Sequence, residues 1–354
     1  MKKMTLILLV TSYFLTACHE YPEPYSTEYY PQPIAYRVIA TTLTNVDYAK
    51  INNNGTIVST IYVNEQIQTA VWRPQSGRQI INMGVENVTN QATDINDNDM
   101  VVGVLEYFDQ SREGFVWDAF NGVRFLSDMV PINSSEILPL GLNNQSQIVG
   151  SYNYDQAFTW DYLVDSTRLD FGQFYATDPV SNIQWSFDAS AVIDVNDQGE
   201  AIAQCNGDSI ACFWSYETGL LPVGNVFTRN GDMNYRYLSE INNYGYSVGS
   251  EQTSDSYIPF MWHKYEGVIY LEQLPFSYAY GEALAINDSN QVVGLAENSD
   301  GNIAAVLWEN GRINDLNNDV DSPWFFDIAY DINDYGQIIV GAANDNRLFL
   351  LDPI

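Results

Sequence analysis

The sequence predicts an all-β protein, a seven-bladed β-propeller, and three observations support this fold. A short segment recurs seven times, each repeat holds four strand signals, and the strands suffice to close a ring. An aliphatic residue precedes asparagine in every repeat, at Ile51–Asn52, Ile95–Asn96, Leu142–Asn143, Val195–Asn196, Ile241–Asn242, Ile286–Asn287 and Ile332–Asn333. Successive asparagines lie 44, 47, 53, 46, 45 and 46 residues apart, which is the period of a four-stranded blade.

A tight turn is expected directly after each asparagine, between the first and second strands. Asn or Asp comes next, and two positions later stands a residue that tolerates positive φ: Gly55, Asp99, Ser146, Gly199, Gly245, Asn290 or Gly336. An apolar pair such as Val101–Val102 then begins the second strand. A glycine often follows the pair, at Gly103, Gly150, Gly249 and Gly294.

A tryptophan marks the end of the third strand in six repeats. It lies 17 to 21 residues beyond the asparagine, at Trp72, Trp117, Trp160, Trp214, Trp262 and Trp308. The seventh repeat carries the run Leu348–Phe349–Leu350 instead. A turn glycine and a fourth apolar strand follow in most repeats, with the glycines at Gly77, Gly122, Gly219, Gly267 and Gly311.

The two ends of the domain are expected to pair. The seventh repeat has only three strands before the chain reaches Ile354. An apolar run, Tyr36–Leu43, precedes the first repeat and can supply the missing fourth strand. Such pairing leaves no open sheet edge, so residues 36–354 are predicted to form one closed propeller.

The repeat resembles that of the HAF-repeat extracellular proteins, named for a His-Ala-Phe run before the tryptophan. The element Ile-Asn-Asp-x-Gly-x-Val-Val-Gly carries the resemblance, which covers residues 36–354. The histidine is absent here, since Gln156 precedes Ala157–Phe158 and Ala211 precedes Cys212–Phe213. The resemblance implies an exported repeat domain and transfers no particular activity.

The first 17 residues are expected to be the signal peptide of a bacterial lipoprotein. Lys2 and Lys3 precede a mostly apolar run, and Leu15–Cys18 resembles a lipobox. By that resemblance, the signal peptide is cleaved before Cys18, and Cys18 is lipidated with acyl chains such as palmitate. An ordinary secretory signal with a chance cysteine is the alternative. His19 rather than Asp after the cysteine favours the outer membrane over the inner one. Residues 18–35, rich in Pro and Tyr, then form a stiff tether.

The remaining cysteines, Cys205 and Cys212, are expected to form a disulfide, because an exported protein folds in an oxidising compartment. Two buried free thiols are the alternative.

Charge and histidine content exclude several classes of function. The net charge is −31, and it becomes −33 when Lys2 and Lys3 leave with the signal peptide, so nucleic-acid binding is not expected.

His19 and His263 are the two histidines of the sequence. Their small number disfavours a Ser-His-Asp triad and histidine metal sites, and no cofactor is expected. Asp94–Asp99 has the oxygen spacing of a calcium loop, but asparagine side chains capping the turn are the preferred interpretation.

Ligand contacts are expected on the face that carries the connections between strands two and three and between blades. The longest tryptophan-to-asparagine segment, from Trp160 to Asn196, is rich in aromatic residues, as are the connections into blades five to seven. Binding residues usually lie on irregular loops over a rigid scaffold. The candidate ligand-binding residues are Trp185, Trp324, Tyr235, Tyr278, Asp188 and Asp327. Aromatic rings that only seal the blade junctions are the alternative.

These observations favour a non-enzymatic binding or scaffolding lipoprotein of the cell envelope. The membrane is its partner through the lipid on Cys18, and an envelope protein or glycan is the expected ligand. The alternative is a carbohydrate-active hydrolase that uses a pair of carboxylates.

Overall fold

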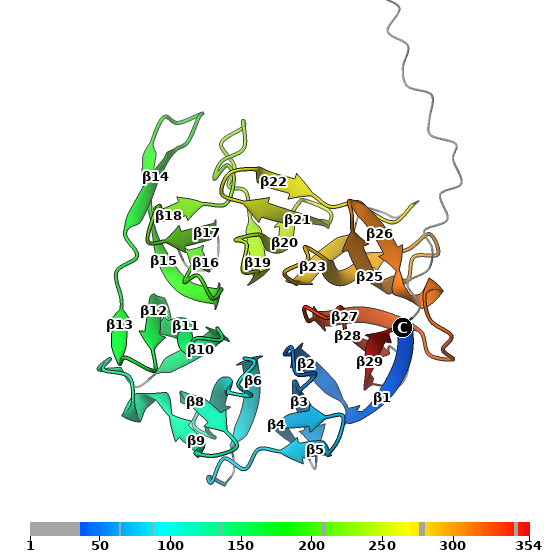
Figure 1. The fold of residues 1–354 in the computed structure, drawn as a ribbon. Helices are drawn as coiled ribbons and strands as arrows, with labels where there is room; N and C mark the ends of the chain where they lie inside the picture. The colour runs from blue at the N-terminus through cyan, green and yellow to red at the C-terminus, as the bar shows by residue number, and fades with distance from the viewer. Residues whose placement is uncertain are drawn as a thin grey trace, which may run out of the picture. The chain divides into compact units, whose positions relative to one another are not determined.

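Seven antiparallel sheets arranged around a central axis form the domain (Figure 1). The computed structural model describes residues 36–63, 65–86, 88–134, 136–206, 210–275, 280–342 and 346–354. The signal peptide, Cys18 and the tether therefore lie outside the described residues. The predicted seven-bladed propeller is confirmed.

Six blades use four consecutive strands, with the first strand at the axis. The first three blades are β2 (Val46–Ile51), β3 (Ile57–Val63), β4 (Gln66–Arg73), β5 (Gly77–Ile80); β6 (Thr89–Ile95), β7 (Val101–Glu106), β8 (Arg112–Asp118), β9 (Gly122–Phe125); and β10 (Ile137–Leu142), β11 (Gln147–Tyr152), β12 (Gln156–Asp161), β13 (Ser166–Arg168). The next three are β15 (Gln184–Val195), β16 (Ala201–Cys205), β17 (Ile210–Ser215), β18 (Gly219–Pro222); β19 (Arg236–Ile241), β20 (Ser247–Gln252), β21 (Tyr257–His263), β22 (Gly267–Tyr270); and β23 (Gly281–Ile286), β24 (Val292–Glu297), β25 (Ile303–Glu309), β26 (Arg312–Asp315). Short 3₁₀ turns follow β9 at Leu126–Asp128 (η1) and β26 at Leu316–Asn318 (η2).

The seventh blade joins the two ends of the domain. It consists of β27 (Phe326–Ile332), β28 (Ile338–Ala342), β29 (Arg347–Pro353) and the N-terminal strand β1 (Tyr36–Thr44). β1 pairs antiparallel with β29, from Tyr36 opposite Pro353 to Thr44 opposite Arg347. The predicted closure is therefore confirmed, and it ties residues about 300 positions apart into one sheet.

All seven turns after the repeated asparagine contain the expected left-handed residue. Its φ lies between 56° and 79° at Gly55, Asp99, Ser146, Gly199, Gly245, Asn290 and Gly336. The six repeat tryptophans are buried, with 3% to 5% of their surface exposed. Strand register corrects one detail in blade seven, because Leu351 pairs with Ile338 just as Trp72 pairs with Ile57. Leu351, and not the run Leu348–Leu350, occupies the tryptophan position.

A β-bulge in the first strand explains the glycine that ends the repeat motif. In blade three the register shifts between Pro139 and Gly141, opposite Gly150. A Cβ on Gly150 would lie 2.0 Å from the Leu138 carbonyl oxygen, a distance that no side chain can occupy. A Cβ on Gly103, Gly249 or Gly294 would meet a backbone oxygen in the same way, so in these blades glycine permits the close approach of two strands. Ala203 and Val340 occupy the equivalent position in blades four and seven.

Blade four departs from the other blades. An extra strand, β14 (Gln173–Thr177), pairs with the first half of β15 and gives a five-stranded sheet. In Figure 1 this hairpin extends beyond the ring of blades. Phe174 and Phe187 stack across it, 5.0 Å apart, in the same apolar cluster as the disulfide.

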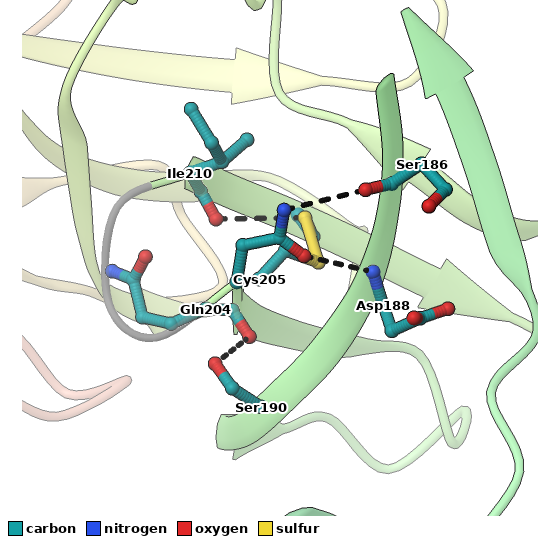
Figure 2. Close-up of a disulfide and its surroundings, with 8 residues drawn as sticks. Ser186, Asp188, Ser190, Gln204, Cys205 and Ile210 are labelled. Atoms are coloured by element: carbon teal, nitrogen blue, oxygen red, sulfur yellow. Dashed lines mark hydrogen bonds between the residues drawn. A yellow bond between two sulfur atoms is a disulfide. The ribbon is translucent and has the colours of Figure 1, made fainter. Parts of the chain in front are cut away.

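The predicted disulfide between Cys205 and Cys212 is present and fully buried (Figure 2). It joins β16 to β17 beneath the blade-four hairpin. The neighbouring Asn206 donates from Nδ2 to the Ser186 carbonyl at 3.3 Å, and Asn206 Oδ1 accepts from the Asp188 backbone N–H at 3.3 Å. The crosslinked loop therefore holds the base of the hairpin.

Candidate functional site

The repeated asparagines form a closed ring of hydrogen bonds around the axis. Each Nδ2 donates to the backbone carbonyl of the asparagine in the next blade, from Asn52 through to Asn333, which returns to Asn52. Each Oδ1 accepts two N–H groups of its own turn, as Asn96 does from Asn98 and Met100. The capping interpretation of the Asn-Asp turns is confirmed, and the asparagines also link the blades.

A second ring lies directly beside the first. The side-chain oxygen of the residue after each asparagine accepts the equivalent backbone N–H of the preceding blade, at 2.8 to 2.9 Å. Asp97 thus accepts from Asn53, and Asn53 accepts from Asp334. These oxygens serve the blade contacts, and among the described residues no cluster of three acidic, histidine or cysteine side chains could hold a metal ion.

An axial cavity of about 680 Å³ continues from these rings along the inner strands. One layer of its wall is charged and consists of the residues two positions before the asparagine: Lys50, Asp94, Asp194, Glu240 and Asp331. The adjoining layer is mostly apolar, with Leu140, Ile193, Leu284, Ile328 and Tyr330. In six inner strands a bulge directly before the charged layer turns two successive side chains, such as Ile193 and Asp194, toward the axis. In β2 the bulge lies at Asp47 instead.

The charged layer holds one ammonium group among four carboxylates. Lys50 Nζ lies 2.8 Å from Glu240 and 3.7 Å from Asp331. Asp94, Asp194 and Asp331 each accept two backbone N–H groups, one from their own blade and one from the next. The carboxylates therefore also connect neighbouring blades.

Burial raises the pKa of every carboxyl in this layer. The pKa of Asp94 rises to about 8, because burial and the nearby Asp194 both disfavour its charge. Burial likewise raises the pKa of Asp194, Glu240 and Asp331, against the opposing attraction of Lys50. The pKa of Lys50 is raised well above its ordinary value, since Asp331 and Glu240 outweigh the burial that opposes its charge. The layer thus favours bound protons or cations.

The blade-four hairpin is the most prominent feature of the predicted binding face. Trp185 is 44% exposed, and Tyr175, Val180 and Ile183 are 58%, 67% and 54% exposed. The hairpin packs on the loop before β19, where the ring of Phe187 lies edge-on to the ring of Phe227 with 6.4 Å between the ring centroids. A Cβ on Gly231 of that loop would lie 2.8 Å from Asp178 Oδ1, so loop and hairpin tip are in close contact.

Among the other predicted contact residues, Asp188 lies on the hairpin opposite Gln173, whereas Trp324 and Asp327 belong to blade seven. Asp188 is exposed on β15, and Tyr235 is 43% exposed before β19. Trp324 is half-buried against Phe349, 4.8 Å away, and Asp327 lies on β27. Tyr278 lies outside the described residues. Among the described residues no hydrogen bond or ring contact joins Trp185 or Asp188 to Trp324 or Asp327, and the sealing interpretation fits Trp324 better.

His263 lies at the end of β21 and stacks on Tyr246, with ring centroids 4.5 Å apart. Its Nδ1 is buried and has no hydrogen-bond partner among the described residues. A catalytic triad needs a carboxylate that orients the histidine. This arrangement does not supply one.

Sequence reasoning did not identify the charged layer of the cavity. A signal existed, because the position before each aliphatic-asparagine pair holds Lys50, Asp94, Gly141, Asp194, Glu240, Ala285 or Asp331. Because this position lies on the innermost strand of each blade, its four acids and one lysine predict a charged layer around the axis. The connections between strands two and three, which belong to the predicted binding face, are short, with two residues between β3 and β4 and five residues between β7 and β8.

Comparisons with known proteins reveal similarity of fold alone. No family model and no curated protein matches the chain. Virginiamycin B lyase from Staphylococcus aureus aligns with TM-score 0.54 at 8% identity, over 90% of this chain and 99% of that one. The β-propeller domain of the Trilobed protease from Pyrococcus furiosus aligns with TM-score 0.54 at 12% identity, over 88% and 96%. That propeller is described as having an open velcro topology, whereas here β1 pairs with β29.

In the part of the chain that the structure describes, no helix has the length and apolar character needed to cross a membrane.

Proposed function

We propose that this chain is a lipid-anchored envelope protein whose propeller binds another envelope protein through the blade-four hairpin. The observation that carries the proposal is the fixed display of exposed apolar side chains on an element that the ring itself does not need. Six blades close without such an extra strand. An exposed apolar patch on a well-anchored element is typical of an interaction site.

The hairpin is held rigidly at its base. The Cys205–Cys212 disulfide, the Asn206 hydrogen bonds and the Phe174–Phe187 stack all lie there. A rigid element loses little conformational entropy on binding, so its contacts contribute more of their energy to affinity. Trp185 is the best anchor, because tryptophan combines large contact area with few rotatable bonds.

A protein ligand fits this surface better than a glycan. Sugars stack on aromatic rings, but the hairpin that carries Trp185 also exposes two branched aliphatic residues, Val180 and Ile183. Apolar and aromatic contacts of this kind are typical of protein interfaces. The acidic net charge of −31 favours a partner with a basic rim.

Photocrosslinking in intact cells tests the binding surface. A photoreactive amino acid at position 185 should give a discrete protein adduct, whereas the same group at Phe120, which is 94% exposed on blade two, should not. Trp185→Ala should weaken co-purification of that adduct partner while leaving the melting temperature unchanged. Equal adducts at both positions, or glycan adducts only, would contradict a protein partner at the hairpin.

The anchor is tested separately through Cys18. Cys18→Ser should give a precursor that takes up no labelled palmitate, because the lipid is attached to this sulfur. Unchanged labelling of Cys18→Ser would remove the lipoprotein interpretation. The HAF-repeat resemblance supports export of the domain.

A carbohydrate-active hydrolase is the second candidate, and one observation favours it. The raised pKa of Asp94, about 8, beside Asp194 provides a protonated acid near a second carboxyl. Both groups, however, use their oxygens to accept backbone N–H groups that link blades. Release of reducing sugar from envelope polysaccharide that is lost in Asp94→Asn would favour the hydrolase.

A further inference from the structure

The axial cavity has features that the linkage of blades does not explain. Its volume of about 680 Å³ lies within the roughly 300–1,000 Å³ of small-molecule sites. Asp47 and Gln91 in its lining are exposed, so the cavity reaches solvent at that end. Leu140, Ile193 and Leu284 face it as half-buried apolar side chains directly beside the charged layer.

The charges in this layer do not balance. Four carboxylates and one ammonium leave a net charge of −3 when all five groups are ionised. Lys50 is engaged by Glu240 and Asp331. Among the described residues Asp94 and Asp194 form no ion pair, although each receives backbone N–H groups. Enclosed carboxylates that lack a counterion attract either a proton or a cation.

An organic cation fits this cavity better than a metal ion. The described acidic side chains do not converge in a group of three that could coordinate a metal. A primary ammonium has three donors and can bridge carboxylates that are too far apart to chelate. Its carbon chain would also bury the apolar layer, which a metal ion would leave uncovered.

We propose that the axial cavity binds a primary ammonium carried on an apolar carbon chain. The ammonium lies between Asp94 and Asp194, and the carbon chain packs on Leu140, Ile193 and Leu284. A small amine or a lysine side chain has this chemistry. The site is separate from the blade-four hairpin, so the proposal of an ammonium ligand does not depend on the proposed protein partner.

Ligand-dependent thermal stabilisation of the full-length protein tests the site. The probe is n-butylammonium chloride, compared at equal concentration with 1-butanol, sodium butyrate and sodium chloride. A ligand that binds only the native state raises the melting temperature in a saturable manner. We expect this for butylammonium alone. Equal stabilisation by butanol or by sodium chloride would overturn the proposal, since it would reveal apolar binding or general screening.

Two variants locate the effect in the cavity. Asp194→Asn should weaken the apparent butylammonium affinity at least tenfold, whereas Asp300→Asn, on an exposed turn, should leave it unchanged. Because Asp194 also links blades and the variant can fail to fold, Leu284→Lys provides a second test. Its ammonium occupies the site from the apolar wall, so butylammonium should no longer stabilise the protein. Retained stabilisation in Leu284→Lys would place the binding elsewhere and overturn the proposal.

Discussion

Asn333 Nδ2 donates a hydrogen bond to the backbone carbonyl of Asn52, 3.1 Å away and 281 residues earlier in the chain. This contact closes a ring that passes through all seven blades. The same asparagine accepts the backbone N–H groups of Tyr335 and Gln337 and is 96% buried, so one side chain serves both a turn and a blade junction.

Removal of this side chain should therefore destabilise the whole domain. Asn333→Ala leaves two turn N–H groups without their partner and removes the interblade hydrogen bond to the Asn52 carbonyl, which keeps only the Gly55 N–H. We expect a loss of about 2–4 kcal/mol in the free energy of unfolding. Urea denaturation measures it. Asn302→Ala, at an exposed position, is the control and should cost under about 0.5 kcal/mol. Equal small losses in both variants would show that the ring contributes little.

The repeat tryptophans should be equally important for stability. Trp117 and Trp262 are 5% and 4% exposed, and truncation of a buried aromatic residue typically costs about 3–5 kcal/mol. Trp117→Ala and Trp262→Ala should accordingly give little folded protein by circular dichroism. Tyr244→Ala, at a residue 66% exposed, should melt like the wild type. Normal melting of both tryptophan variants would contradict the repeat alignment.

The disulfide should stabilise blade four moderately. Cys205 and Cys212 close a loop of about 8 residues, which corresponds to roughly 2.5 kcal/mol in the chain-entropy description. The double variant Cys205→Ser/Cys212→Ser should show this decrease in calorimetry. Relative to the wild type, its hydrogen-exchange protection should fall more at Phe187 on β15 than at Val102 in blade two. The native exported protein should not react with alkylating agents at these positions. Two reactive thiols would rule the crosslink out.

Stability should fall as pH rises from about 4 to about 8. The pKa of Asp94 is raised to about 8 in the native protein from an ordinary value of 3.8, so within this window the native state holds a proton that the unfolded chain has released. Rising pH therefore favours unfolding until the native group also ionises, and the effect ends above about 8. Asp194, Glu240 and Asp331 shift in the same direction.

Urea midpoints at pH 5, 7 and 9 measure this dependence. Asp94→Asn should flatten the decline between pH 5 and 7, while Asp300→Asn at an exposed position should retain it. An identical pH profile in wild type and Asp94→Asn would show that Asp94 does not carry the effect.

The repeat made the architecture predictable, because local signals encode it. Aliphatic-asparagine pairs, left-handed turn residues such as Asp99 and Ser146, and the buried tryptophans act within one blade and recur at one period. Their number also predicted that Tyr36–Leu43 would complete blade seven, since a propeller must close. The Cys205–Cys212 crosslink could be predicted because only two cysteines remain after the lipobox.

Tertiary structure alone decided what the repeated positions do together. The ring from Asn52 to Asn333 and the carboxylates around Lys50 require groups from different blades to meet at one axis, and no local signal states that geometry. Likewise, the aromatic residues of the blade connections look alike in sequence. Packing distinguishes Trp185, which is 44% exposed on an added hairpin, from Trp324, which covers Phe349. Burial depends on neighbours far along the chain, and only the folded ring supplies them.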